Sequence, residues 1–194
     1  MNFTEAVSEI LEITGRPDKQ VAAENAVNSI LNLLTYRANF VEDLVEATHI
    51  NAQPTLYEGT ISKTTFPNLR KLKYIRATSI VDLLEDLPVD KIITNGVVRK
   101  NIFYLAGTNI NWVLDKVTPS FEIGYYVFPS KLTDASPTHW MLTMYPYAIV
   151  DLAIAKVFLS IGDTTAASGY QASGTSLYLT MRNDMEDGIS AKAQ

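Results

Sequence analysis

Four carboxylates lie close together in the middle of the sequence, at Asp82, Glu85, Asp86 and Asp90. Clustered carboxylates can bind a divalent cation or exchange protons with a substrate. Their spacing does not match a calcium-binding loop, which needs regular oxygen ligands and a central glycine. The surrounding segment, residues 79–87, has the apolar spacing of a short helix. We therefore interpret the carboxylates as the solvated face of a helix rather than as a metal or acid–base site.

No other arrangement of residues is typical of catalysis. His49 and His139 each stand without a neighbouring carboxylate or second ligand. The absence of cysteine excludes disulfides, thiolate metal sites and cysteine nucleophiles. The sequence also has no glycine-rich phosphate loop and no Gly-x-Ser-x-Gly nucleophile elbow. We expect no catalytic residue, no cofactor and no metal, and we do not expect an enzyme.

A basic segment surrounds Tyr74 and consists of Arg70, Lys71, Lys73 and Arg76. Alternation along a strand would place Arg70, Tyr74 and Arg76 on one face. It would place Lys71 and Lys73 on the other. The segment could contact a nucleic-acid backbone, or dock on an acidic protein surface such as the helical part of a neighbouring copy. It could also be an edge strand whose charges prevent aggregation, which is the interpretation that we favour.

Several aromatic residues follow in the second half of the chain. They could stack on bases or on a sugar, but such residues more often fill one face of a sheet, and we favour packing. They are Tyr125, Tyr126, Phe128, Trp140 and Tyr145.

Charge is unevenly distributed along the 194 residues. Residues 1–60 carry a net charge of −6, residues 61–140 carry +3 and residues 141–194 carry −2, which together give −5. A net acidic chain disfavours tight, non-specific DNA binding, because phosphates are repelled. The longest apolar stretch is broken by Asp151 and Lys156, so it predicts a buried helix rather than a membrane span. The first residues lack the pattern of a secretory signal, and we expect a cytosolic product.

Helical patterns occur at both ends of the chain. Asn2 and Glu5 fit a capping box at the start of a first helix, which Gly15 ends. A second helix is predicted to begin at Pro17 and to run to about residue 36 or 40. Its predicted polar face consists of Glu24, Asn25, Asn28 and Asn32, and its apolar stripe includes Val21.

Two further helices are predicted near the C-terminus. One begins near Pro146 and is apolar nearly all round, so we expect it at the centre of the core. The other covers residues 164–185. Gly169 and Gly174 each weaken it by about 1 kcal/mol relative to alanine, which favours a helix that a partner stabilises. Its best stripe, and our candidate contact with another protein, contains Tyr170, Leu177, Tyr178 and Met181.

Between these helices, short β-like runs alternate with turn residues. Asn95-Gly96 and Gly107-Thr108-Asn109 are turn signals, and the second predicts a hairpin. The fold class that follows is α+β: residues 1–44 and 141–185 form a helical bundle, residues 45–140 form a β-rich insertion, and residues 186–194 form a flexible tail. The predicted strands are residues 47–50, 71–78, 91–94, 102–106, 110–114 and 121–128.

Three segments, in order, resemble a family of tailed-phage head–tail connector proteins. They are ILEITGRPD (residues 10–18), TTFPNLRKLKYIR (residues 64–76) and YPYAIVDLAIAKVFLSIGD (residues 145–163). The layout is also similar to that of tail tubular protein A of short-tailed phages. The last helix departs from the family because it is richer in Gly, Ser and Thr.

The resemblance implies a structural virion protein with no catalytic residues. Such an adaptor forms a homo-oligomeric ring, of about twelve copies, in the neck between capsid and tail. Its partners would be the portal protein and a tail or nozzle protein, and genome DNA would pass through the lumen without specific binding. Assembly would take place in the host cytoplasm, without a membrane. The alternative is a small nucleic-acid-binding or regulatory module that uses the basic strand 70–76; an enzyme is a distant third.

Overall fold

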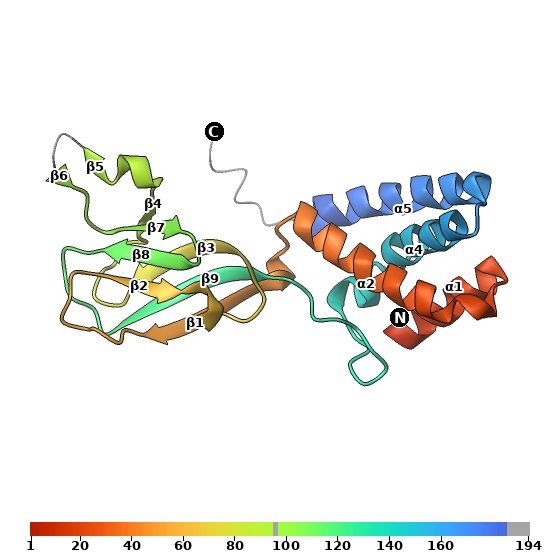
Figure 1. Cartoon of the computed structure of the whole chain (residues 1–194), viewed down its shortest axis with the longest axis horizontal. Coiled ribbons are helices and arrows are strands. Elements are labelled where there is room, and N and C mark those ends of the chain that lie inside the picture. The colour runs from red at the N-terminus through yellow and green to blue at the C-terminus, as the bar shows by residue number, and fades with distance from the viewer. Residues whose placement is uncertain (95–96, 186–194) are drawn as a thin grey trace. The chain divides into compact units, whose positions relative to one another are not determined.

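The computed structural model describes residues 1–94 and 97–185 (Figure 1). The turn predicted at Asn95-Gly96 and the tail predicted at residues 186–194 lie outside the described residues. The chain divides into two compact units, after Asp43 and after Val127. We call residues 1–43 with 128–185 the helical unit, and Leu44–Val127 the sandwich unit. The predicted α+β class is confirmed, with helices at both ends of the chain and strands between them.

The first helix of the helical unit, α1 (Phe3–Thr14), begins and ends as its sequence predicts. The Asn2 side chain accepts a hydrogen bond from the Glu5 N–H, the Glu5 carboxylate accepts one from the Asn2 N–H, and Gly15 ends the helix at a φ of 61°. The short 3-10 helix η1 (Pro17–Lys19) follows, so α2 (Gln20–Arg37) begins three residues later than Pro17. Val21 is 68 % exposed, which corrects its place in the apolar stripe.

The helix α4 (Pro146–Ser160) is the centre of the helical unit, as its all-round apolar pattern predicts. It contacts α1, α2, α5 (Thr164–Met185) and the short helix α3 (Trp140–Met144), which the sequence did not predict. Helix α5 packs along α4, and an alanine Cβ at Gly174 would lie 2.7 Å from Leu152 Cγ and 2.9 Å from the Leu152 backbone nitrogen. Gly174 therefore permits a close approach within the chain. The partner protein that the glycines of α5 predict stays a prediction, since Gly174 packs on α4 of the same chain and nothing lies within 4 Å of a Cβ at Gly169.

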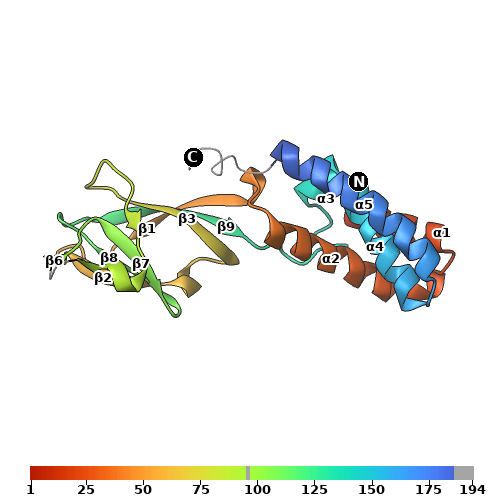
Figure 2. The same ribbon diagram turned by 90° about the horizontal axis from the view of Figure 1, so that it is seen from above.

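Two sheets face each other in the sandwich unit and share one core (Figure 2). The first has the order β1-β9-β3: β1 (Leu44–Ile50), β9 (Ser120–Val127) and β3 (Leu69–Ala77). The second has the order β2-β8-β7-β4: β2 (Glu58–Ser62), β8 (Asn109–Val113), β7 (Ile102–Ala106) and β4 (Glu85–Asp86). The β5 (Ile93–Thr94) and β6 (Val97–Val98) strands pair separately. The hairpin predicted at Gly107 is confirmed, since β7 and β8 are antiparallel around a glycine with a φ of 57°.

The core between the sheets contains Trp112 and Phe121, whose ring centroids are 5.1 Å apart. Gly59 permits this packing, because an alanine Cβ there would lie 2.5 Å from the Trp112 ring. The first strand of the unit pairs with the last: Leu44 of β1 lies opposite Tyr126 of β9. The chain therefore enters and leaves the sandwich at adjacent positions of one sheet.

Three predictions about this region are wrong. Residues 79–87 form no helix, because the N–H groups of Leu84 and Leu87 bond to the carbonyl oxygens of Ile75 and Phe103, which fixes the segment on the sandwich. Residues 91–94 form a strand only at the end; the 3-10 helix η4 (Val89–Lys91) precedes it. Residues 128–140 belong to the helical unit rather than to the insertion, because Asn28 of α2 holds Leu132 of that segment.

Replacing Asn2 with alanine is expected to lower the free energy of unfolding by about 1 kcal/mol, because the cap of α1 loses its acceptor. Chemical denaturation followed by circular dichroism measures the change. Ser8→Ala, at an exposed position of the same helix, is the control and is expected to leave stability nearly unchanged. Equal effects of the two substitutions would show that the cap contributes nothing.

Candidate interaction surfaces

The basic segment lies on β3, at an edge of the three-stranded sheet. The register of β3 against β9 shifts twice, between Leu69 and Lys71 and between Leu72 and Tyr74. Each shift adds a residue to β3, so strict alternation fails. Lys71 lies opposite Tyr126 and Tyr74 lies opposite Gly124, which are alternate positions of β9 and share one face. The predicted separation of Lys71 from Tyr74 and Arg76 is therefore wrong.

The sheet itself neutralises part of the basic segment. Arg76 forms an ion pair with Glu122, its partner on β9. The Tyr74 hydroxyl donates a hydrogen bond to the carboxylate of Glu46 on β1, and its ring crosses Gly124, where a Cβ would lie 2.3 Å from the ring. Burial, together with the hydrogen bond and charge of Glu46, raises the pKa of Tyr74 to about 12. On this side of β3, Tyr74 and Arg76 are thus paired with carboxylates of the neighbouring strands.

Two of the three remaining cations of the segment lie beside one aromatic ring. The Arg70 guanidinium carbon lies 5.4 Å from the centroid of the Tyr126 ring, and the Lys73 ammonium lies 5.9 Å from it. Both distances are within the range of cation–π contacts. Tyr126 is only 2 % exposed, so it offers no open aromatic face to a base. Lys71 is exposed.

The four residues predicted as a contact on the terminal helix differ in accessibility. Tyr178 is 5 % exposed and Met181 is fully buried, and both belong to the core of the helical unit. Their prediction as partner contacts is corrected, since the face of α5 that carries them packs inside the chain. Tyr170 is half-buried and stacks on Phe158 of α4, with ring centroids 5.8 Å apart. Leu177 is exposed, so its prediction as a contact with another protein stays open to test.

The carboxylates of residues 82–90 lie on an exposed segment of the sandwich unit. Glu85 forms an ion pair with Arg99, 2.7 Å apart, and all four acidic side chains are exposed. Burial of part of the Asp86 side chain raises the pKa of its carboxyl group. In the described part of the chain, no three His, Cys, Asp or Glu residues are grouped so that they could hold a metal ion.

Of the aromatic residues, Tyr125 packs in the sandwich core and Trp140 packs against the core of the helical unit, as we favoured.

The two histidines have separate surroundings. His49 on β1 lies 6.0 Å from the Phe66 ring, and burial lowers its pKa. His139 precedes α3, where its Nδ1 accepts a hydrogen bond from the Met141 N–H at 3.2 Å. Burial lowers the pKa of His139 to about 4.

The low pKa of His139 makes stability depend on pH. In the unfolded chain the His139 imidazole has a pKa near 6.5, whereas in the folded chain it becomes protonated only near pH 4. Stability is therefore complete above about pH 6.5 and falls as the pH drops toward 4, by about 1–2 kcal/mol at pH 5. Urea denaturation at pH 7.5 and pH 5 measures the loss. His139→Asn keeps a capping acceptor without the titration, and an undiminished pH dependence in that variant would contradict this assignment.

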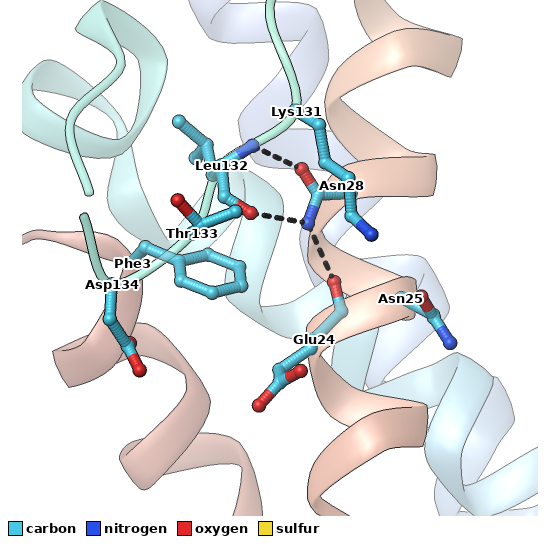
Figure 3. Close-up of a pocket in the computed structure, with 8 residues that line it drawn as sticks. All are labelled: Phe3, Glu24, Asn25, Asn28, Lys131, Leu132, Thr133 and Asp134. Atoms are coloured by element: carbon cyan, nitrogen blue, oxygen red, sulfur yellow. Dashed lines mark hydrogen bonds between the residues drawn. The ribbon is translucent and has the colours of Figure 1, made fainter. Parts of the chain in front are cut away.

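A small polar hollow of about 140 Å³ lies where α2 meets residues 131–134 (Figure 3). The Asn28 amide spans it: its Nδ2 donates to the carbonyl oxygens of Glu24 and Leu132, and its Oδ1 accepts from the Leu132 N–H at 2.7 Å. Asn28 is 9 % exposed, which corrects its place on the polar face of α2. Through these hydrogen bonds the Asn28 amide acts as a clamp that holds Leu132, and with it residues 131–134, against α2.

A second depression, of about 240 Å³, lies between three helices of the helical unit. We call it the α2/α4/α5 groove. No single stretch of sequence indicates this groove, although each contributing helix presents residues at helical spacing. Its lining consists of Ile30, Leu33, Leu34 and Arg37 of α2, Leu152, Ala155, Lys156 and Leu159 of α4, and Gln171, Thr175 and Tyr178 of α5.

The sequence matches no protein-family model, and no curated protein matches it. Within the described residues, no helix is both long enough and apolar enough to cross a membrane.

Proposed function

We propose that this chain is a structural protein of a tailed-phage virion, an adaptor that forms a ring between the portal and the tail. The proposal includes the neck of the virion as its location, the portal and a tail or nozzle protein as its partners, and a lumen through which DNA passes. It combines the resemblance of three sequence segments with the architecture of the chain.

The observation that carries the proposal is the presence of two separately packed bodies in one short chain. The helical unit has a core built from both chain ends, and the sandwich unit has a core of its own. A protein that joins two different assemblies needs two such recognition surfaces. This architecture is also the one that the resemblance implies.

The charge of the two units supports the same conclusion. The described helical unit has six basic and eleven acidic residues, a net charge of −5, whereas the sandwich unit has nine basic and eight acidic residues, a net charge of +1. An acidic body repeated around a ring repels phosphates, so DNA could pass without adhering. The nearly neutral sandwich unit suits contact with protein.

Electron microscopy of the full chain mixed with a purified portal from the same phage tests the proposal. We expect a ring of density added to one end of the portal. A monomer in the absence of portal is compatible with the proposal, because assembly can require the portal as a template. A chain that never decorates the portal at any concentration would refute it.

A nucleic-acid-binding module is the second candidate, and the cations around Tyr126 favour it. Against it, Arg76 is paired with Glu122, and Tyr126 is covered. Titration of the chain with duplex and single-stranded DNA at several salt concentrations separates the two candidates. Tight binding with a steep salt dependence would favour this second function over the adaptor.

A further inference from the structure

The α2/α4/α5 groove has an apolar floor and an open apolar rim. Leu34, Ala155 and Tyr178 on the floor are each at most 5 % exposed. Leu33 and Leu159 on the rim are 39 % and 53 % exposed, although both are large aliphatic side chains. The volume of about 240 Å³ is below the range of about 300–1,000 Å³ that is usual for small-molecule sites. The groove therefore suits one or two side chains from another protein surface.

The groove is basic on an acidic body. Arg37 and Lys156 both line it and are both exposed, and none of the eleven described acidic residues of the helical unit is among its lining residues. Lys156 donates a hydrogen bond to Ser29 of α2, which holds its ammonium beside that helix. An occupant should therefore present an aliphatic side chain flanked by carboxylates.

The exposed face of α1 presents that combination. Glu9, Glu12 and Ile13 stand three and four positions apart, so they share one side of the helix. Ile13 is 40 % exposed and Glu12 is exposed, while the opposite side of α1 is buried in the core. Glu5, one turn earlier, is committed to the capping box. The two remaining carboxylates match the two cations of the groove in number.

We propose that the α2/α4/α5 groove of one copy binds the Glu9–Glu12–Ile13 face of α1 in a second copy. Ile13 would enter between Leu33 and Leu159, and the two carboxylates would meet Arg37 and Lys156. The groove and the α1 face share no residue. The contact is therefore heterologous: the copy that contributes its groove keeps its α1 face for a further neighbour, and the copy that contributes its α1 face keeps its groove. Repetition of such a contact closes a ring when the rotation between copies permits it. The inference deepens the proposed function by naming a contact between subunits.

Site-directed cross-linking tests the contact directly, because the chain has no cysteine of its own. Full-length Ile13→Cys and Leu159→Cys variants are mixed and treated with a short bismaleimide. The control pair is Val21→Cys with Leu159→Cys, since Val21 is exposed on α2 but lies outside the groove. The concentration is raised until the control pair gives visible collision product. We expect at least a fivefold excess of heterodimer from the Ile13 pair at that point, and equal yields would overturn the proposal.

Charge exchange tests the pairing independently. Arg37→Glu/Lys156→Glu and Glu9→Lys/Glu12→Lys are each expected to reduce the cross-linked fraction about tenfold. Mixing these two double variants, or combining all four substitutions in one chain, should restore it, and the combined variant keeps the original net charge. Lys100→Glu/Lys116→Glu, two exposed positions on the sandwich unit, is the control and should have no effect. Failure of both restorations would overturn the proposal, even if each double variant alone weakens association.

These results separate this contact from the adaptor proposal. A ring on the portal without excess Ile13 cross-linking would leave the adaptor function intact and refute the groove contact. Excess cross-linking with charge rescue, in a chain that never decorates the portal, would establish self-association and refute the adaptor function.

Discussion

Asn28→Ala is expected to lower the free energy of unfolding by about 2–4 kcal/mol. The substitution removes the partners of both the N–H and the carbonyl oxygen of Leu132, which is 3 % exposed. Each buried backbone group left without a hydrogen bond costs about 1–3 kcal/mol. Because the clamp holds residues 131–134 against α2, their backbone amides are expected to exchange hydrogen faster as well. Urea denaturation and hydrogen-exchange mass spectrometry measure the two effects.

Asn25→Ala is the matched control for this prediction. Asn25 lies on the same helix and lines the same hollow (Figure 3), but it is exposed and none of the clamp hydrogen bonds involves it. Its replacement should change stability by no more than about 0.5 kcal/mol. If the two alanine variants are equally stable, the hydrogen bonds of Asn28 do not hold the segment.

Gly174→Ala and Gly169→Ala are expected to have opposite signs, although both replace a glycine within α5. Alanine favours a helix over glycine by about 1 kcal/mol at either position. At Gly169 nothing lies within 4 Å of the added methyl, so stability should rise by about 0.5–1 kcal/mol. At Gly174 the methyl would meet the Leu152 backbone nitrogen at 2.9 Å, so α5 must move away from α4, and stability should fall by about 1–2 kcal/mol.

Thermal and urea unfolding of the two variants provide the comparison. A Gly174→Ala protein that is as stable as Gly169→Ala would mean that α5 does not approach α4 so closely. The combination Gly174→Ala/Leu152→Ala removes the Leu152 side chain but leaves its backbone nitrogen. It is therefore expected to recover little of the loss.

Patterns that depend on neighbouring residues were predicted well. The capping box at Asn2, the end of α1 at Gly15, the start of α4 at Pro146 and the hairpin at Gly107 all agree with the structure. In each case the physical cause lies within a few residues of the position that it determines. Residues 164–185 were predicted as a helix with its observed bounds for the same reason.

Features that depend on distant contacts were not predictable in this way. Residues 79–87 have a helical apolar pattern, yet hydrogen bonds to β3 and β7 hold them on the sandwich. Asn28 lies in a polar stretch of sequence that is typical of a solvated helix face. Its hydrogen-bond partner, Leu132, is more than a hundred positions away in the sequence. The glycines of α5 were interpreted as a sign of a partner protein, whereas Gly174 packs against α4 of the same chain and Gly169 has no atom within 4 Å of an added Cβ. The α2/α4/α5 groove requires three helices to converge, and a single helical stripe does not reveal this.

The pairing of Leu44 with Tyr126 has a consequence for how such a gene can change. The two points at which the chain leaves and rejoins the helical unit are neighbours across one ladder, about 5 Å apart. A short turn could connect them, and a different body with adjacent ends could replace everything between them. Recombination within this interval would exchange what the insertion recognises while the buried centre around α4 kept every one of its residues. The helical unit could in this respect carry different inserted domains at the same position of the chain.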